Sequence, residues 1–148
     1  MIGNAGEYFV CAELCKRNIL ALLTPKNNPL FDIIASDPDG KRSVHIQVKT
    51  MSIGNKQGWK LGKNMTKKRN NPKLFVVLVN MHEEKPNDYY IYKYDEFTIR
   101  VNEMYKEYIS EKKRDGTPKK ELGFRFFDFR YFKTKDDNRL NKWSNLGF

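Results

Sequence analysis

The chain has 148 residues, of which 39% are hydrophobic and 14% aromatic, enough to fold as a single domain (1–148) and not the composition of a disordered chain. The chain has 28 Lys and Arg against 18 Asp and Glu, a net charge of +10. This excess favours a protein that binds a polyanion over a merely soluble basic protein, and nucleic acid is favoured over a membrane as the polyanion. No segment approaches the roughly 18 consecutive apolar residues of a membrane span, and no secretory signal opens the chain, so we expect a cytoplasmic protein.

A first helix is predicted over residues 3–17, which contain no proline. At helical spacing Gly3, Gly6, Val10 and Leu14 share one side of this helix with Glu7. A carboxylate among small and apolar side chains is costly to desolvate unless something pairs with it. Glu7 therefore either reaches solvent at the edge of the stripe or points inward for a functional reason.

The two cysteines, Cys11 and Cys15, lie four residues apart on this predicted helix. Only His45 and His82 could add imidazole ligands, and neither has a close metal-ligand spacing to the pair. Because a structural zinc site usually needs four such ligands, we interpret the cysteines as small apolar helix residues in a reducing compartment.

Three strands are predicted next, over residues 19–23, 30–35 and 42–50. The second and third are joined by Asp37-Pro38-Asp39-Gly40, which has Pro at the second position of a turn and Gly where a positive φ is needed. Alternation in the third strand divides its side chains between two faces. Val44, Ile46 and Val48 share one face, and His45, Gln47 and Lys49 share the other.

Basic residues without any acid follow the third strand directly. This basic stretch contains Lys56, Lys60, Lys63, Lys67, Lys68, Arg69 and Lys73. We predict that its residues up to Arg69 contact nucleic acid, since clustered cations neutralise phosphates. Trp59, within the stretch, either stacks on a base or packs over a sheet edge, and packing is the favoured interpretation.

The remaining elements complete a sheet of mixed direction with the first helix packed on it. Residues 54–62 indicate a short hairpin or loop, and 74–79 form a continuous apolar strand of the kind that is buried on both faces. Residues 89–94 predict a further strand and 96–113 a second helix. From Leu122 the chain is rich in aromatic residues, which we interpret as packing, and 138–146 could close it with a short helix.

Two carboxylates, a Gln and a Lys near this sheet would suit a metal ion and a phosphodiester. Mg²⁺ prefers oxygen ligands and keeps several waters, so one or two protein carboxylates can be sufficient. Asp32 could bind the ion directly, and Glu7 directly or through water. The Gln47 amide oxygen and the Val48 carbonyl could complete the set, with Lys49 beside the attacking water.

These residues resemble the PD-(D/E)XK nuclease superfamily, which includes restriction endonucleases and archaeal Holliday junction resolvases. The resemblance covers about the first 80 residues and rests on Gly6-Glu7, Phe31-Asp32 and Gln47-Val48-Lys49. The Gln in place of the second acid looks like the variant of Mrr-like restriction proteins. The implied fold is an α/β, restriction endonuclease-like mixed β-sheet core in the order helix-strand-strand-strand-helix-strand, here with an aromatic-rich C-terminal extension.

The resemblance implies an enzyme, an endonuclease that uses Mg²⁺ (or Mn²⁺) to hydrolyse DNA phosphodiester bonds in prokaryotic restriction, repair or mobile-element biology. Its catalytic residues would be Glu7, Asp32, Gln47 and Lys49, with Val48 as a further metal ligand. DNA is the implied partner, and a homodimer stays open, because many enzymes of this fold dimerise to cut two strands.

Three departures from the family pattern bear on this interpretation. Phe31 stands where the motif has Pro, and Gln47 removes one negative charge from the site. A tight hairpin at Asp37–Gly40 would also pair Asp32 with Ile46 and aim the carboxylate at the apolar face, so the nuclease hypothesis requires a bulge or a wider loop. The alternatives are a catalytically inactive nucleic-acid-binding module on the same fold and a protein-interaction domain with an acidic partner.

Overall fold

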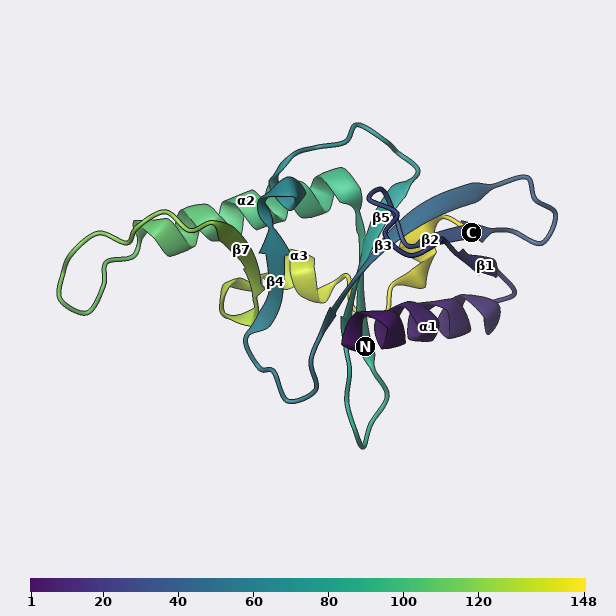
Figure 1. Ribbon diagram of the computed structural model, residues 1–148, viewed down its shortest axis with the longest axis horizontal. Coiled ribbons are helices and arrows are strands. Elements are labelled where there is room, and N and C mark those ends of the chain that lie inside the picture. Colours follow the sequence, from purple (N-terminus) through teal and green to yellow (C-terminus); the bar gives the residue numbers. More distant parts are fainter.

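The computed structural model describes residues 1–148 (Figure 1). In chain order the elements are α1 (Ile2–Cys15), β1 (Leu20–Leu23), β2 (Ile33–Ser36), β3 (Ser43–Met51), β4 (Gly58–Gly62), the 3-10 helix η1 (Lys63–Thr66), β5 (Leu74–Asn80), β6 (Asp88–Lys93), α2 (Tyr94–Ser110), β7 (Phe124–Asp128), the 3-10 helix η2 (Phe129–Tyr131), α3 (Thr134–Asp137) and the 3-10 helix η3 (Trp143–Leu146). None of the helices is both long enough and apolar enough to cross a bilayer.

Five strands form the main sheet, in the order β1-β2-β3-β5-β6. The β3–β5 pair is parallel and the other pairs are antiparallel, so the predicted mixed direction is confirmed. The continuous apolar run of β5 lies next to β3, away from both edges of the sheet, and all its residues from Leu74 to Val79 are buried. Its side chains alternate between two cores, which is why the run has no polar face.

The two cores lie on opposite faces of this sheet. On one face Val10 and Leu14 of α1 pack with Trp143 and Leu146 of η3. On the other face α2 and the small β4–β7 sheet pack over β5 and β6. Figure 1 shows α1 alongside β1–β3, while α2 runs beside β4 and β7. The first helix therefore packs on the sheet as predicted.

The order helix-strand-strand-strand-helix-strand is present as α1, β1, β2, β3, η1 and β5. The helix between the third and fourth strands of that order is only the four-residue η1, and β4 is inserted before it. The aromatic-rich extension supplies β7 and η2, whose Phe127 and Tyr131 are buried, so its packing role is confirmed.

Of the hairpin or loop predicted over residues 54–62, the hairpin is wrong: residues 54–57 are a loop, and residues 58–62 form β4. Within them β4 pairs antiparallel with β7, with Trp59 opposite Phe127. A partner so far along the chain leaves no local signal, because only the tertiary fold brings the two strands together. Trp59 is 1% exposed and donates its Nε1 hydrogen bond to the Val79 carbonyl at 3.0 Å, so it packs in the core.

Several element ends also differ from the sequence prediction. Gly3 is exposed and does not join the buried side of α1. The second strand begins at Ile33, so Asp32 lies just before it and not within it. The second helix spans Tyr94–Ser110 instead of 96–113, and the C-terminal helical turn is limited to η3.

A buried ion pair ties α3 to α2. Asp136 is fully buried, and its Oδ2 accepts a hydrogen bond from Nη2 of Arg100 at 2.8 Å. Arg100 Nε and the Tyr92 hydroxyl donate to Oδ1 at 3.0 and 2.9 Å. Burial alone would raise the pKa of Asp136, but the hydrogen bonds from Arg100, the Lys133 amide and Tyr92 hold it below its usual value of 3.8.

We expect Asp136→Asn to lower the free energy of unfolding by about 3–5 kcal/mol, because Arg100 would keep a buried charge without this partner. Since folding lowers the Asp136 pKa, the stabilisation is complete above pH 3.8 and is lost as the pH falls through the folded-state value. Urea unfolding between pH 7 and pH 3 measures both effects. The matched control is Asp137→Asn, exposed on the same helix; equal losses in the two variants would contradict the role of the pair.

Candidate functional site

The register of β2 against β3 decides where Asp32 points. Ile33 pairs with Ile46 and Ser36 with Ser43, one residue wider than a hairpin that pairs Asp37 with Lys41. The extra residue lies in the turn, where the Asp37 amide donates to the Arg42 carbonyl at 3.1 Å. Ile33 and not Asp32 consequently pairs with Ile46, and Asp32 lies just before the strand, where its half-buried side chain lines a polar hollow instead of joining the apolar core. The wider loop required by the sequence analysis is present.

Asp32 is fixed at the point where β2 has not yet begun to pair with β3. Its amide donates to the Ile46 carbonyl at 2.9 Å, and its Oδ2 accepts the Val48 amide at 2.7 Å. In a strand the N–H and C=O of one residue point to the same side, so the Val48 carbonyl is also directed at this edge of β3. The Asp32 carboxylate thus takes the place of a β2 carbonyl as the acceptor for the Val48 amide, next to the Val48 carbonyl.

Glu7 reaches the same place from α1 because the helix crosses β3 very closely at Gly6. A Cβ on Gly6 would lie 1.9 Å from Thr50 Oγ1, so only glycine allows this approach. Glu7 is half-buried and lines a polar hollow together with Asp32. Of the two alternatives for Glu7, the structure therefore favours the inward one.

Charged neighbours act on Glu7. Burial raises the pKa of Glu7, and the Asp32 carboxylate raises it further. Lys26 and Lys49 act in the opposite direction and lower it. The two carboxylates are therefore close enough to repel each other, and a cation bound between them would relieve this repulsion.

These donors fit a hard divalent cation. Two carboxylates, the amide oxygen of Gln47 and the Val48 carbonyl are all oxygen ligands, as Mg²⁺ or Mn²⁺ prefers. No group of three or more His, Cys, Asp or Glu gathers in the structure, so this site offers an ion two carboxylates, Glu7 and Asp32. Cys11 and Cys15 form no disulfide, and burial raises the pKa of the Cys11 thiol to about 11, which keeps the thiol protonated.

His45 shares the face of Gln47 and Lys49, but its ring is engaged elsewhere. It stacks on Phe31 with 4.2 Å between ring centroids and 6° between planes. Phe31, which stands where the motif has Pro, packs on β3 through this stack.

The basic stretch lies on β4, η1 and the loop to β5. A hollow there is lined by Lys63, Asn64, Thr66, Lys67, Lys68 and Arg69. Asp95 of α2 anchors this loop, because its two carboxylate oxygens accept the amides of Arg69 at 2.8 Å and Asn70 at 3.1 Å. Lys63 pairs with Glu121 at 3.2 Å, and Lys60 lies over the Phe124 ring at 4.4 Å. Lys56, Lys67 and Lys68 are exposed and form no ion pair.

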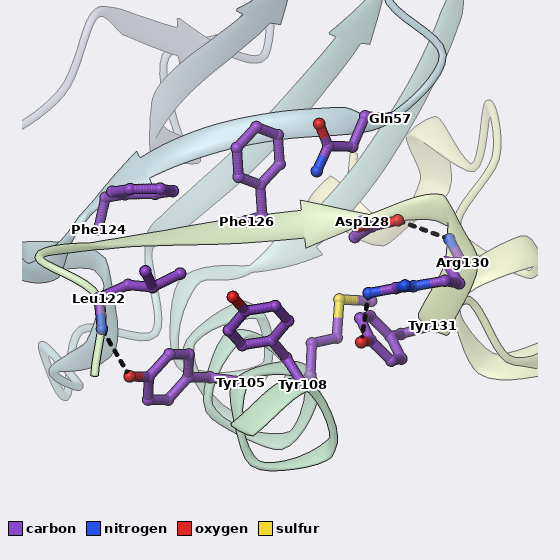
Figure 2. Close-up of a pocket in the computed structure, with 10 residues that line it drawn as sticks. Gln57, Tyr105, Tyr108, Leu122, Phe124, Phe126, Asp128, Arg130 and Tyr131 are labelled. Atoms are coloured by element: carbon purple, nitrogen blue, oxygen red, sulfur yellow. Dashed lines mark hydrogen bonds between the residues drawn. The ribbon is translucent and has the colours of Figure 1, made fainter. Parts of the chain in front are cut away.

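A second cavity, of about 210 Å³, lies between β7 and α2 and is mainly aromatic. Figure 2 shows Tyr105 and Tyr108 of α2 on one side of β7 and Phe124 and Phe126 projecting on the other. Some of its polar groups are paired within the protein: Asp128 accepts the Arg130 amide at 2.8 Å, and the Tyr131 hydroxyl donates to Glu111 at 2.8 Å.

Comparisons with known proteins agree with this architecture. No protein-family model matches the chain, and no curated protein matches its sequence. A bacterial homing endonuclease, I-Ssp6803I, is similar in structure, with a TM-score of 0.56 and 15% identity over 96% of this chain and 88% of that chain. The fold is restriction endonuclease-like. Archaeoglobus fulgidus Hjc, a Holliday junction resolvase, has a TM-score of 0.48 and 13% identity over 86% of this chain and 84% of that chain.

We expect Gly6→Ala to destabilise the nuclease-like fold by about 1–3 kcal/mol, because the added methyl group would push α1 away from Thr50. Gly3→Ala is the matched control, since nothing lies within 4 Å of its Cβ and alanine is the better helix former. Urea denaturation of both variants measures the difference. Equal stability of the two would show that α1 does not depend on the close approach at Gly6.

Proposed function

We propose that this protein is a Mg²⁺-dependent endonuclease that hydrolyses DNA phosphodiester bonds. The observation that carries this proposal is the position of Asp32, which is bonded to the Val48 amide and lines one polar hollow with Glu7. A register one residue tighter would turn this carboxylate into the apolar core. The nuclease fold and the net charge of +10 support the same function.

Each side chain of the site has a chemical role in this proposal. Glu7, Asp32, Gln47 and the Val48 carbonyl would hold the metal ion. A bound Mg²⁺ supplies Lewis-acid activation of water and neutralises charge on the phosphate. Lys49 orients the attacking water and stabilises the negative charge that develops on the phosphate oxygens.

The basic stretch would bind the phosphate backbone of the DNA. Lys67 and Lys68 project from a loop that Asp95 holds against α2, so their charges lie on a fixed surface. Neither is neutralised by an acid of the protein, which leaves both available for phosphates.

A catalytically inactive DNA-binding module is the second candidate. Gln47 favours it, because this residue lowers the number of acids in the site to two, Glu7 and Asp32. Salt-sensitive DNA binding without cleavage in either Mg²⁺ or Mn²⁺ would support this module over the nuclease.

The double variant Asp32→Asn/Lys49→Met should lose at least about 100-fold in plasmid cleavage, because it removes a metal ligand and the cation beside the attacking water. DNA binding and thermal stability should stay close to wild type. Asp39→Asn, an exposed acid in the β2–β3 turn, is the control for loss of a carboxylate. Cleavage by the double variant at the wild-type rate would rule out this site.

We expect Lys67→Ala/Lys68→Ala to weaken DNA binding and to reduce the slope of log K against log salt by about 1.8, since two phosphate contacts are lost. Fluorescence anisotropy with a DNA duplex at several salt concentrations measures the slope. Lys112→Ala/Lys113→Ala, an exposed pair beyond the end of α2, removes the same charge elsewhere. If the two double variants have equal slopes, the basic stretch is not the DNA-binding surface.

A further inference from the structure

The hollow that Glu7 and Asp32 share has a third wall, the loop between β1 and β2. Its lining residues, none of them hydrophobic, are Asn4, Glu7, Thr24, Pro25, Lys26, Asn27, Asn28 and Asp32. Its volume is about 240 Å³, room for a phosphate group and accompanying water. Lys26 is the one basic residue among these.

The β1–β2 loop is tied to Asp32 itself. Thr24 donates its amide to the Asp32 carbonyl at 2.9 Å and its hydroxyl to the Phe31 carbonyl at 2.9 Å. Between these ends, Asn28 donates its amide to the Pro25 carbonyl at 3.2 Å, and Asn27 has a φ of 69°. These hydrogen bonds hold the turn that carries Lys26 in position relative to Asp32.

Lys26 acts on the site and has no other partner. It forms no ion pair with any acid of the protein. Its place in the lining of the hollow makes it a neighbour of both carboxylates. Nothing in the sequence singles out Lys26, because the polar break between Pro25 and Pro29 has the composition of any surface loop.

The charges of the site explain why a second lysine is useful. Glu7 and Asp32 together carry two negative charges, which repel an approaching phosphodiester. Lys49 offsets one of these charges and Lys26 the other, so a bound divalent ion leaves the site positive toward the phosphate. Without Lys26, one carboxylate charge is left uncompensated by the protein.

We propose that Lys26 is a second phosphate-binding residue of this site, which holds a phosphodiester oxygen from the β1–β2 loop while Lys49 acts from β3. This inference rests on the proposed nuclease function. It identifies the substrate contact on the α1 side of Asp32, and the basic stretch binds the backbone further along.

The test compares Lys26→Met, Lys26→Arg and Lys41→Met. Lys41 is 80% exposed in its side chain and lies in the turn at the far end of β2 and β3, so its loss removes the same charge away from the site. Plasmid cleavage in Mg²⁺ should fall about 10- to 100-fold in kcat/KM for Lys26→Met, the range expected for a hydrogen bond to a charged group. Lys26→Arg should recover most of the activity, and Lys41→Met should match wild type.

Binding of a DNA duplex in Ca²⁺, which replaces Mg²⁺ without turnover, is the second measurement. Lys26→Met should lower the slope of log K against log salt by about 0.9 relative to Lys41→Met, because one phosphate contact is lost. Thermal unfolding confirms that each variant is folded.

The outcomes separate this inference from the proposed function. If wild type cleaves DNA and Lys26→Met equals Lys41→Met in both kcat/KM and salt slope, the role of Lys26 is overturned. The nuclease proposal is then unaffected. Absence of cleavage by wild type contradicts the nuclease proposal, and the Ca²⁺ binding slopes then decide whether Lys26 contacts phosphate. A lower slope in Lys26→Met supports that contact, and an unchanged slope excludes it.

Discussion

The hydrogen bond from the Val48 amide to the Asp32 carboxylate is the contact on which the candidate site depends. It forms where β2 has not yet begun, so that the side chain of Asp32 takes the place of a backbone partner. The register in which β2 pairs with β3 consequently fixes the position of the Asp32 carboxylate. Shifting the pairing by one residue would both break this bond and bury the charge.

The other parts of the site reach Asp32 from different layers of the fold. Glu7 arrives on α1, whose distance from β3 is set by Gly6 against Thr50. Gln47 and Lys49 lie on the opposite face of β3 from the core under α1. The Asp32 carboxylate accepts the Val48 amide at the edge of β3, so the candidate site lies where α1, β3 and the loop before β2 meet.

Sequence patterns predicted most of the central fold because each rests on local periodicity or turn chemistry. The alternation in β3, the uninterrupted apolar run of β5 and the Asp37–Gly40 turn all have the expected form. The β4–β7 pairing escaped prediction, because it joins Trp59 to Phe127 across the whole of α2. Contacts between segments so distant in the chain leave no periodic signal in either one.

The sequence by itself determined the chemistry available to this protein: two carboxylates, a Gln and a Lys on elements in a nuclease-like order, with a large excess of positive charge. It also determined that Gln47 and Lys49 share a strand face, because alternation in a strand is a local property. Only the tertiary structure decided where Asp32 lies, since one extra residue in the β2–β3 turn leaves it just before the paired strand, beside Glu7. It likewise decided that Lys26 lies beside the carboxylates, because the hydrogen bonds of Thr24 fold the loop back onto Asp32.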